Sequence, residues 1–96
     1  MYAVIRTYSG NGARTLFDLV EAGSTEVESL MRAIKGFVSY SVARSGDGGF
    51  TVTICQDKPG TDESVRVARE WVAKNIPHGT AIPMPQISEG PVILHA

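Results

Sequence analysis

Four side chains in this sequence have the chemistry to hold a small molecule and exchange a proton with it. Arg6 and Tyr8 stand two residues apart in a strand-like run, so a strand places both on one face. A guanidinium binds phenolates or carboxylates, and the hydroxyls of Tyr8 and Tyr40 are possible proton donors to a bound oxygen. Trp71, the only tryptophan, offers a pocket wall or an indole N–H donor. These residues predict a pocket for a small, largely apolar molecule.

Each of these residues also has a purely structural interpretation. If the strand face with Arg6 meets helices, the guanidinium enters a pocket; if it meets a partner subunit, Arg6 is an interface anchor, which we favour because charges avoid burial. Trp71 lies on the apolar stripe of a predicted helix, where core packing is the favoured role. Tyr8 and Tyr40 are equally explained as core aromatics whose hydroxyls reach solvent. The alternatives stay open for all four.

The remaining reactive side chains give weaker signals. His78, between Pro77 and Gly79, is a candidate pocket residue, but a solvated position at a helix end explains it better. Cys55 has no base nearby to lower its pKa, so we expect a buried small residue and not a nucleophile. No spacing of His, Cys, Asp or Glu predicts a metal site, and no glycine-rich motif predicts a nucleotide.

Composition narrows the function classes further. The chain of 96 residues is expected to form one domain, residues 1–96, and its net charge of −1 without a basic cluster argues against nucleic-acid binding. No apolar run approaches the ~20 residues that span a bilayer, and no signal peptide is recognisable, so no membrane partner is expected. The single cysteine fits a reducing compartment. We therefore expect a cytoplasmic protein.

The elements that must position these residues follow from hydrophobic periodicity and turn residues. A strand is predicted over 2–8, a hairpin of strands over 37–44 and 50–56, and a final strand over 91–95. Apolar positions from Leu16 to Ile34 predict one helix with a weak point at 23–24 or two short pieces, with Thr15–Asp18 and the capping box Thr25–Glu28 as competing starts. A second helix is predicted from Thr61 or Asp62 to about Ile76, followed by a proline-rich extended connection over 78–91.

This order, β-α-β-β-α-β, predicts an α+β, ferredoxin-like fold: an antiparallel four-stranded sheet with two helices on one face. The other face is left for a partner. The strands do not alternate cleanly between apolar and charged residues; one face is small and semi-polar, as in Thr51, Thr53 and Cys55 or Ser39 and Ser41. Such a face suits burial against another sheet, so we expect a homodimer that pairs through the sheet face.

A family resemblance agrees with this expectation. The element order, the segments 34–40 and 87–92 and the hairpin turn 47–49 together resemble the dimeric α/β-barrel superfamily, and within it the antibiotic-biosynthesis-monooxygenase-like group. The resemblance implies a homodimer whose two sheets form a barrel, with a small pocket between sheet and helices in each subunit. Members include cofactor-free oxygenases acting on aromatic polyketides, haem-degrading enzymes and proteins without known activity.

The leading functional hypothesis is accordingly a cofactor-independent monooxygenase acting on aromatic or other small apolar substrates. Its candidate catalytic residues are Trp71, Arg6 and Tyr8, and its candidate pocket residues are Tyr40, Trp71 and His78. The alternative is a non-catalytic dimer that binds a small ligand or serves as a scaffold. Haem binding or degradation is less favoured, because the haem-degrading relatives have an asparagine on the first strand and this chain does not.

Overall fold

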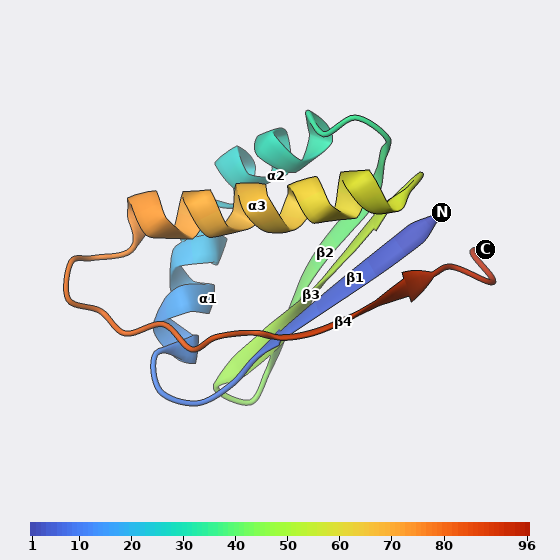
Figure 1. Ribbon diagram of the computed structural model, residues 1–96. Helices are drawn as coiled ribbons and strands as arrows, with labels where there is room; N and C mark the ends of the chain where they lie inside the picture. The colour runs from blue at the N-terminus through green and yellow to red at the C-terminus, as the bar shows by residue number, and fades with distance from the viewer.

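Three helices cover one face of a four-stranded antiparallel sheet in the computed structural model, which describes all residues 1–96 (Figure 1). The strand order is β2-β3-β1-β4. The α+β, ferredoxin-like architecture predicted from the sequence is confirmed. The strands are β1 (Tyr2–Tyr8), β2 (Phe37–Ser45), β3 (Gly48–Cys55) and β4 (Gln86–Pro91), and the helices are α1 (Ala13–Ala22), α2 (Ser24–Arg32) and α3 (Lys58–Asn75).

The first helical region consists of two short pieces, because the chain changes direction at Gly23 against the indole of Trp71. A Cβ atom at Gly23 would lie 2.6 Å from Cζ2 of that ring, so only glycine allows this approach. Both predicted starts are wrong, because Gly12 and Gly23 occupy the N-cap positions without any side-chain cap. The indole thus lies directly against the α1–α2 junction.

Helix α3 begins three residues earlier than the nearer predicted start. Asp57 caps it by accepting a hydrogen bond from the Gly60 amide at 3.2 Å. Thr61 and Ser64 lie inside the helix and are buried, with their hydroxyls bonded to backbone carbonyls of the preceding turn. A Cβ atom at Gly60 would come 2.7 Å from Cβ of Cys55, so the glycine lets the helix start close to β3.

The predicted final strand, 91–95, is wrong. Strand β4 covers Gln86–Pro91 and pairs antiparallel with β1, from Thr7 opposite Gln86 to Tyr2 opposite Pro91. One hydrogen bond follows this proline, from the Val92 amide to the Met1 carbonyl at 2.9 Å, and the pairing ends there. Beyond it, Ile93 and Leu94 are almost fully exposed, and both chain termini lie at the same end of the sheet (Figure 1).

The two faces of the sheet differ in chemistry. Thr51, Thr53 and Cys55 are buried beneath the helices, so the prediction that this semi-polar side of β3 faces a partner is wrong. It is the alternate residues of β3 that point to the open side, and there Phe50 is 37% exposed beside Ile5 of β1 at 39%. Every open-side position of the sheet is uncharged: Ala3, Ile5 and Thr7; Ser39, Ser41 and Ala43; Phe50, Val52 and Ile54; Gln86, Ser88 and Gly90.

Candidate small-molecule site

Arg6 lies in the interior between the sheet and the helices, where it is 4% exposed in the single chain. The favoured sequence interpretation, an anchor for a partner subunit, is therefore wrong: alternation along β1 turns Arg6 to the helix side together with Val4. Its Nη1 donates a hydrogen bond to the Tyr8 hydroxyl at 3.2 Å. Its Nε and Nη2 are buried without a hydrogen-bond partner in the protein.

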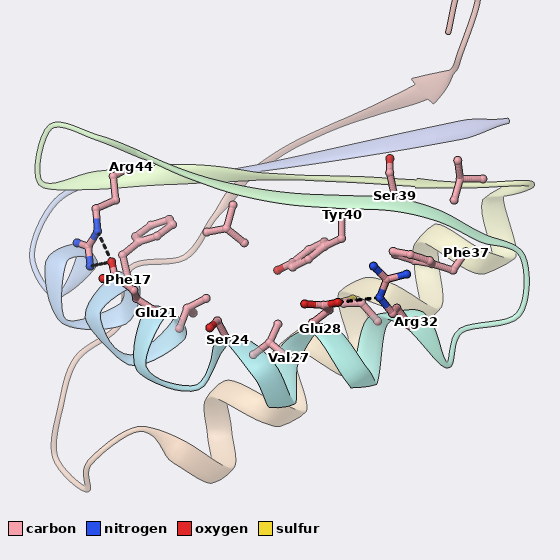
Figure 2. Close-up of a pocket in the computed structure, with 14 residues that line it drawn as sticks. Phe17, Glu21, Ser24, Val27, Glu28, Arg32, Phe37, Ser39, Tyr40 and Arg44 are labelled. Carbon is pink, nitrogen blue, oxygen red and sulfur yellow. Dashed lines mark hydrogen bonds and ion pairs between the residues drawn. The ribbon is translucent and has the colours of Figure 1, made fainter. Parts of the chain in front are cut away.

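Tyr40 of β2 also points to the helix side of the sheet, toward α2 (Figure 2). Burial raises the pKa of its hydroxyl above the usual value, while the nearby positive charge of Arg6 acts in the opposite direction. Burial is the larger effect, so Tyr40 is a neutral phenol at pH 7. It can therefore donate a hydrogen bond or a proton, but it cannot act there as a base.

Between β1 and β2, strand β3 adds two further polar side chains to this interior. The hydroxyls of Thr51 and Thr53 are buried without hydrogen-bond partners. Thr51 lies opposite Arg6 on one side, and Thr53 lies opposite Tyr40 on the other. We call Arg6, Tyr8, Tyr40, Thr51 and Thr53 the polar cluster. Buried polar groups are nearly always satisfied, so four unpartnered polar atoms in one cluster indicate that its partner comes from outside the chain.

The helices close this cluster with an apolar wall. Trp71 is 6% exposed and belongs to the core, and its indole Nε1 donates a hydrogen bond to Oε1 of Glu26 at 3.0 Å. The indole N–H is therefore engaged within the protein, which leaves the ring as a wall. Phe17 packs edge-to-face on Tyr8, with ring centroids 5.9 Å apart, and holds that tyrosine beside Arg6.

Three spaces meet around the polar cluster. The inner cavity, about 30 Å³, lies between the cluster and the wall and has room for about one water molecule. The β2 groove, about 510 Å³, opens between β2 and the helices α1 and α2 (Figure 2). The β4 pocket, about 460 Å³, opens between α3, β1 and β4. The inner cavity shares Phe17, Val20, Val27, Met31 and Tyr40 with the β2 groove, and Arg6, Tyr8, Leu16, Ala68 and Val72 with the β4 pocket.

The structure brings together four of the five residues that the sequence singled out. Arg6, Tyr8, Tyr40 and Trp71 all line the inner cavity. His78 is exposed in the turn after α3 and lines none of these three spaces. Cys55 is fully buried, and burial is the main cause that raises the pKa of its thiol.

Several residues of the site escaped the sequence analysis. Thr51 and Thr53 were assigned to the partner face, although their alternation with apolar neighbours was visible. Arg69 adjoins the apolar stripe of α3 and lines the β4 pocket. The stripe alone did not predict this position for Arg69. The connection after α3 supplies Ile82 and Pro83 to the same pocket, a contact that depends on long-range folding.

Neither a cluster of metal-ligating side chains nor a helix that could span a membrane is found. No group of three or more His, Cys, Asp or Glu side chains is close enough to hold a metal ion. No helix is both long enough and apolar enough to cross a bilayer. Any ligand of the polar cluster must accordingly be recognised by arginine, hydroxyls and apolar side chains.

Comparison with known proteins identifies solved structures that have the same fold. No protein-family model matches the chain, and no curated protein matches it in sequence. Among solved structures, a protein of unknown function from Nitrosomonas europaea has a TM-score of 0.68 at 16% identity, covering 99% of this chain and 90% of that one. A monooxygenase from Streptomyces coelicolor, solved with nanaomycin D, has a TM-score of 0.59 at 21% identity, covering 99% and 92%.

Two further solved structures share this fold: one is an oxygenase, and the other has a bound porphyrin. SnoaB, a cofactor-independent oxygenase from Streptomyces nogalater, has a TM-score of 0.55 at 12% identity, covering 98% of this chain and 92% of that one. MhuD with bound manganese protoporphyrin IX has a TM-score of 0.57 at 18% identity, covering 99% and 96%. At these identities the likeness concerns the fold. The chain shares the ferredoxin-like α+β fold of these structures.

Proposed function

We propose that this protein binds a small, largely apolar aromatic substrate between its sheet and helices and oxidises it with O₂, without a cofactor. The observation that carries the proposal is the buried guanidinium of Arg6, which has two unpartnered N–H groups and lies beside two tyrosine hydroxyls. A buried positive charge without a counter-ion stabilises negative charge that develops nearby. Substrate carbanions are what such an oxygenase must stabilise.

The reaction balances with O₂ as the only oxidant. A methylene carbon activated by flanking aromatic rings loses a proton to solvent, and the carbanion adds O₂. The resulting peroxide takes up a proton and loses water to leave a carbonyl, so one oxygen atom enters the product and the other leaves as water. Arg6 lowers the energy of the carbanion by its field, because opposite charges attract strongly where water is excluded.

The other cluster residues would have distinct roles. Tyr40 is protonated at neutral pH, which suits a donor to the peroxide oxygen and excludes a role as base there. Tyr8 fixes Arg6 through their hydrogen bond. Trp71 limits the space available to the substrate ring and orients it.

A non-catalytic ligand-binding or scaffold protein is the second candidate. It is supported by the size of the inner cavity, about 30 Å³, which is too small for an aromatic ring without movement of the wall. A haem ligand is less well supported, because His78 is exposed and remote from the three spaces.

The test is oxygen uptake by the purified protein with an anthrone, whose methylene carbon fits this chemistry. We expect turnover that falls at least tenfold in Arg6→Met and also falls in Tyr40→Phe, but is unchanged in Arg66→Gln, a control on the outer side of α3. Wild-type protein that binds the anthrone without oxygen uptake would support the non-catalytic candidate. A Soret shift on haem addition that disappears in His78→Ala would instead favour haem.

We also propose that the open sheet face pairs with a second copy of this chain. The face is apolar at its centre, where Ile5 and Phe50 are more than one-third exposed, and it has no charged position along any strand. Two such faces can be buried against each other without desolvating an ion. Sedimentation equilibrium should give about twice the chain mass of 10.3 kDa. A concentration-independent monomer would contradict the pairing, and Phe50→Lys should weaken it.

A further inference from the structure

The arginines of this protein fall into two groups, according to whether an acidic side chain pairs with the guanidinium. Arg44 presents its Nε and Nη2, which lie on one edge of the guanidinium, to the same oxygen of Glu21 at 3.2 and 3.1 Å. Arg6 has the same two nitrogens free of any partner, although they are buried. An edge of this kind carries two parallel N–H groups, and these match the two oxygens of a carboxylate. Arg6 thus lacks the kind of partner that Arg44 has.

The surroundings of Arg6 contain no acidic side chain to fill this role. Neither the inner cavity nor the β4 pocket has an Asp or Glu among its lining residues. The β4 pocket adds a second cation, Arg69, which forms no ion pair in the structure. The rest of its lining is mainly apolar: Leu16, Val65, Ala68, Val72, Ile82, Pro83, Met84, Pro85 and Ile87.

We infer that the β4 pocket takes a small apolar molecule bearing a carboxylate, with the carboxylate on Nε and Nη2 of Arg6. The inference rests on the proposed function, because it names the substrate class of the same site. The apolar body lies against α3 and β4, and Arg69 at the pocket adds to the attraction for the anion. The carboxylate takes no part in the reaction and balances only one of the two positive charges of Arg6 and Arg69, so a net positive charge remains to stabilise the carbanion. The carbon that reacts with O₂ lies elsewhere on the substrate, near Tyr8 and Tyr40.

A phenolate is the less suitable ligand for this edge. Its single oxygen can accept from both donors, as Oε1 of Glu21 does from Arg44, but a carboxylate offers a separate oxygen to each of the two parallel donors. A single water molecule fits the inner cavity by volume, but it supplies no negative charge to balance a buried guanidinium. The carboxylate is the ligand that satisfies both donors and the charge. Nε and Nη2 are buried, so side chains between the β4 pocket and the inner cavity, such as Leu16 and Val72, must move to admit it.

The test compares acids with their uncharged amides. Acetate, benzoate and 2-naphthoate are titrated by calorimetry against acetamide, benzamide and 2-naphthamide, with the full-length chain at pH 7. We expect at least one acid, most strongly one with an aromatic body, to bind at least tenfold more tightly than its amide. If every amide binds as tightly as its acid, or if no acid binds below about 10 mM, the inference is overturned.

Variants locate the binding. Arg6→Met should remove the preference for acids, and Arg6→Lys should reduce it, because lysine keeps the charge but has no fork of parallel donors. Arg69→Gln should weaken acid binding by a smaller factor, and its matched control Arg66→Gln, paired with Glu63 and Glu70 on the same helix, should leave it unchanged. Acid preference that survives in Arg6→Met overturns the assignment.

A second measurement avoids the possibility that Arg6→Met fails to fold. In the unaltered protein, the side-chain Nε–H resonance of Arg6 should move downfield as the acid is added, in proportion to saturation. A bound acid that leaves this resonance unchanged overturns the inference. Failure of the proposed function has a different signature: acids bind through Arg6, but no substrate, acidic or neutral, supports oxygen uptake.

Discussion

The β2 groove and the β4 pocket are similar in size, but the arginines of the groove are paired with acids and those of the pocket are not. In the groove, each arginine has an acidic partner: Arg32 meets Glu28 at 2.8 Å, and Arg44 meets Glu21 at 3.1 Å (Figure 2). Arg44 also meets Asp18 at 2.8 Å. In the β4 pocket, neither Arg6 nor Arg69 has one. Size therefore does not distinguish the two spaces, whereas unpaired charge does, and the proposed binding site is assigned on that charge.

The burial of these charges reinforces the contrast. The ion pairs of the groove lie at the exposed rim, where water and salt weaken them, so they contribute little to stability. Arg6 is buried, and a buried charge without a partner is costly. The proposed carboxylate ligand would remove this cost, because it supplies the partner that the acids of the chain do not.

The largest expected effect concerns the wall of the inner cavity, which shares lining residues with both spaces. Trp71→Phe removes the hydrogen bond to Glu26 and part of a buried ring, so the free energy of unfolding should fall by about 2 kcal/mol. Chemical denaturation measures the change. Glu26→Gln keeps an acceptor for the indole and should cost much less. Equal losses in the two variants would contradict this account, because they would trace the loss to the charge of Glu26 and not to the ring or to the presence of an acceptor.

An acidic side chain introduced into the β4 pocket should pair with Arg6, as the acids of the β2 groove pair with its arginines. Val72→Glu places a carboxylate on α3 at a position that lines both the inner cavity and the β4 pocket. The new side chain should pair with Arg6 and reduce the affinity for 2-naphthoate at least tenfold, or about 1.4 kcal/mol. Calorimetry measures it, and Val72→Gln is the control of matched size. If both variants bind the acid equally well, competition for Arg6 is not the mechanism.

The raised pKa of Tyr40 predicts a pH dependence on the side of the cluster that faces the groove. The folded state holds this proton more tightly than the unfolded state, so its contribution to stability is complete below the usual tyrosine pKa of about 10 and is lost as the pH rises through the higher folded value. Tyr40→Phe should therefore show a smaller loss of stability above pH 10 than the wild type. Denaturation at a series of pH values measures it, and identical losses would contradict the assigned cause.

The smallest effect is expected in the groove itself. Arg44→Gln breaks the exposed pairs with Asp18 and Glu21. It should leave the melting temperature and the binding of 2-naphthoate unchanged within error, because exposed ion pairs are screened by solvent. A loss of acid binding in this variant would move the site from the β4 pocket to the groove.

The sequence predicted the site residues that depend on local strand or helix position, and it missed those that depend on long-range contacts. Arg6, Tyr8, Tyr40 and Trp71 were selected by residue type and strand or helix position, and they do meet at the inner cavity. His78 was a candidate through the resemblance to haem-degrading proteins, but it lies exposed in the turn after α3. Arg69 was missed, because its role comes from the connection that folds over the pocket.

By itself, the sequence determined the element order, the β2–β3 hairpin and the apolar stripe of α3, because periodicity and turn residues act over a few positions. Only the tertiary structure decided which face of β1 and β3 the helices cover. Alternation divides a strand into two faces but does not say which one is buried, so Arg6 had two possible environments. It also decided that β4 pairs along 86–91 and that no acid approaches Arg6, since pairing of distant segments sets which charges meet.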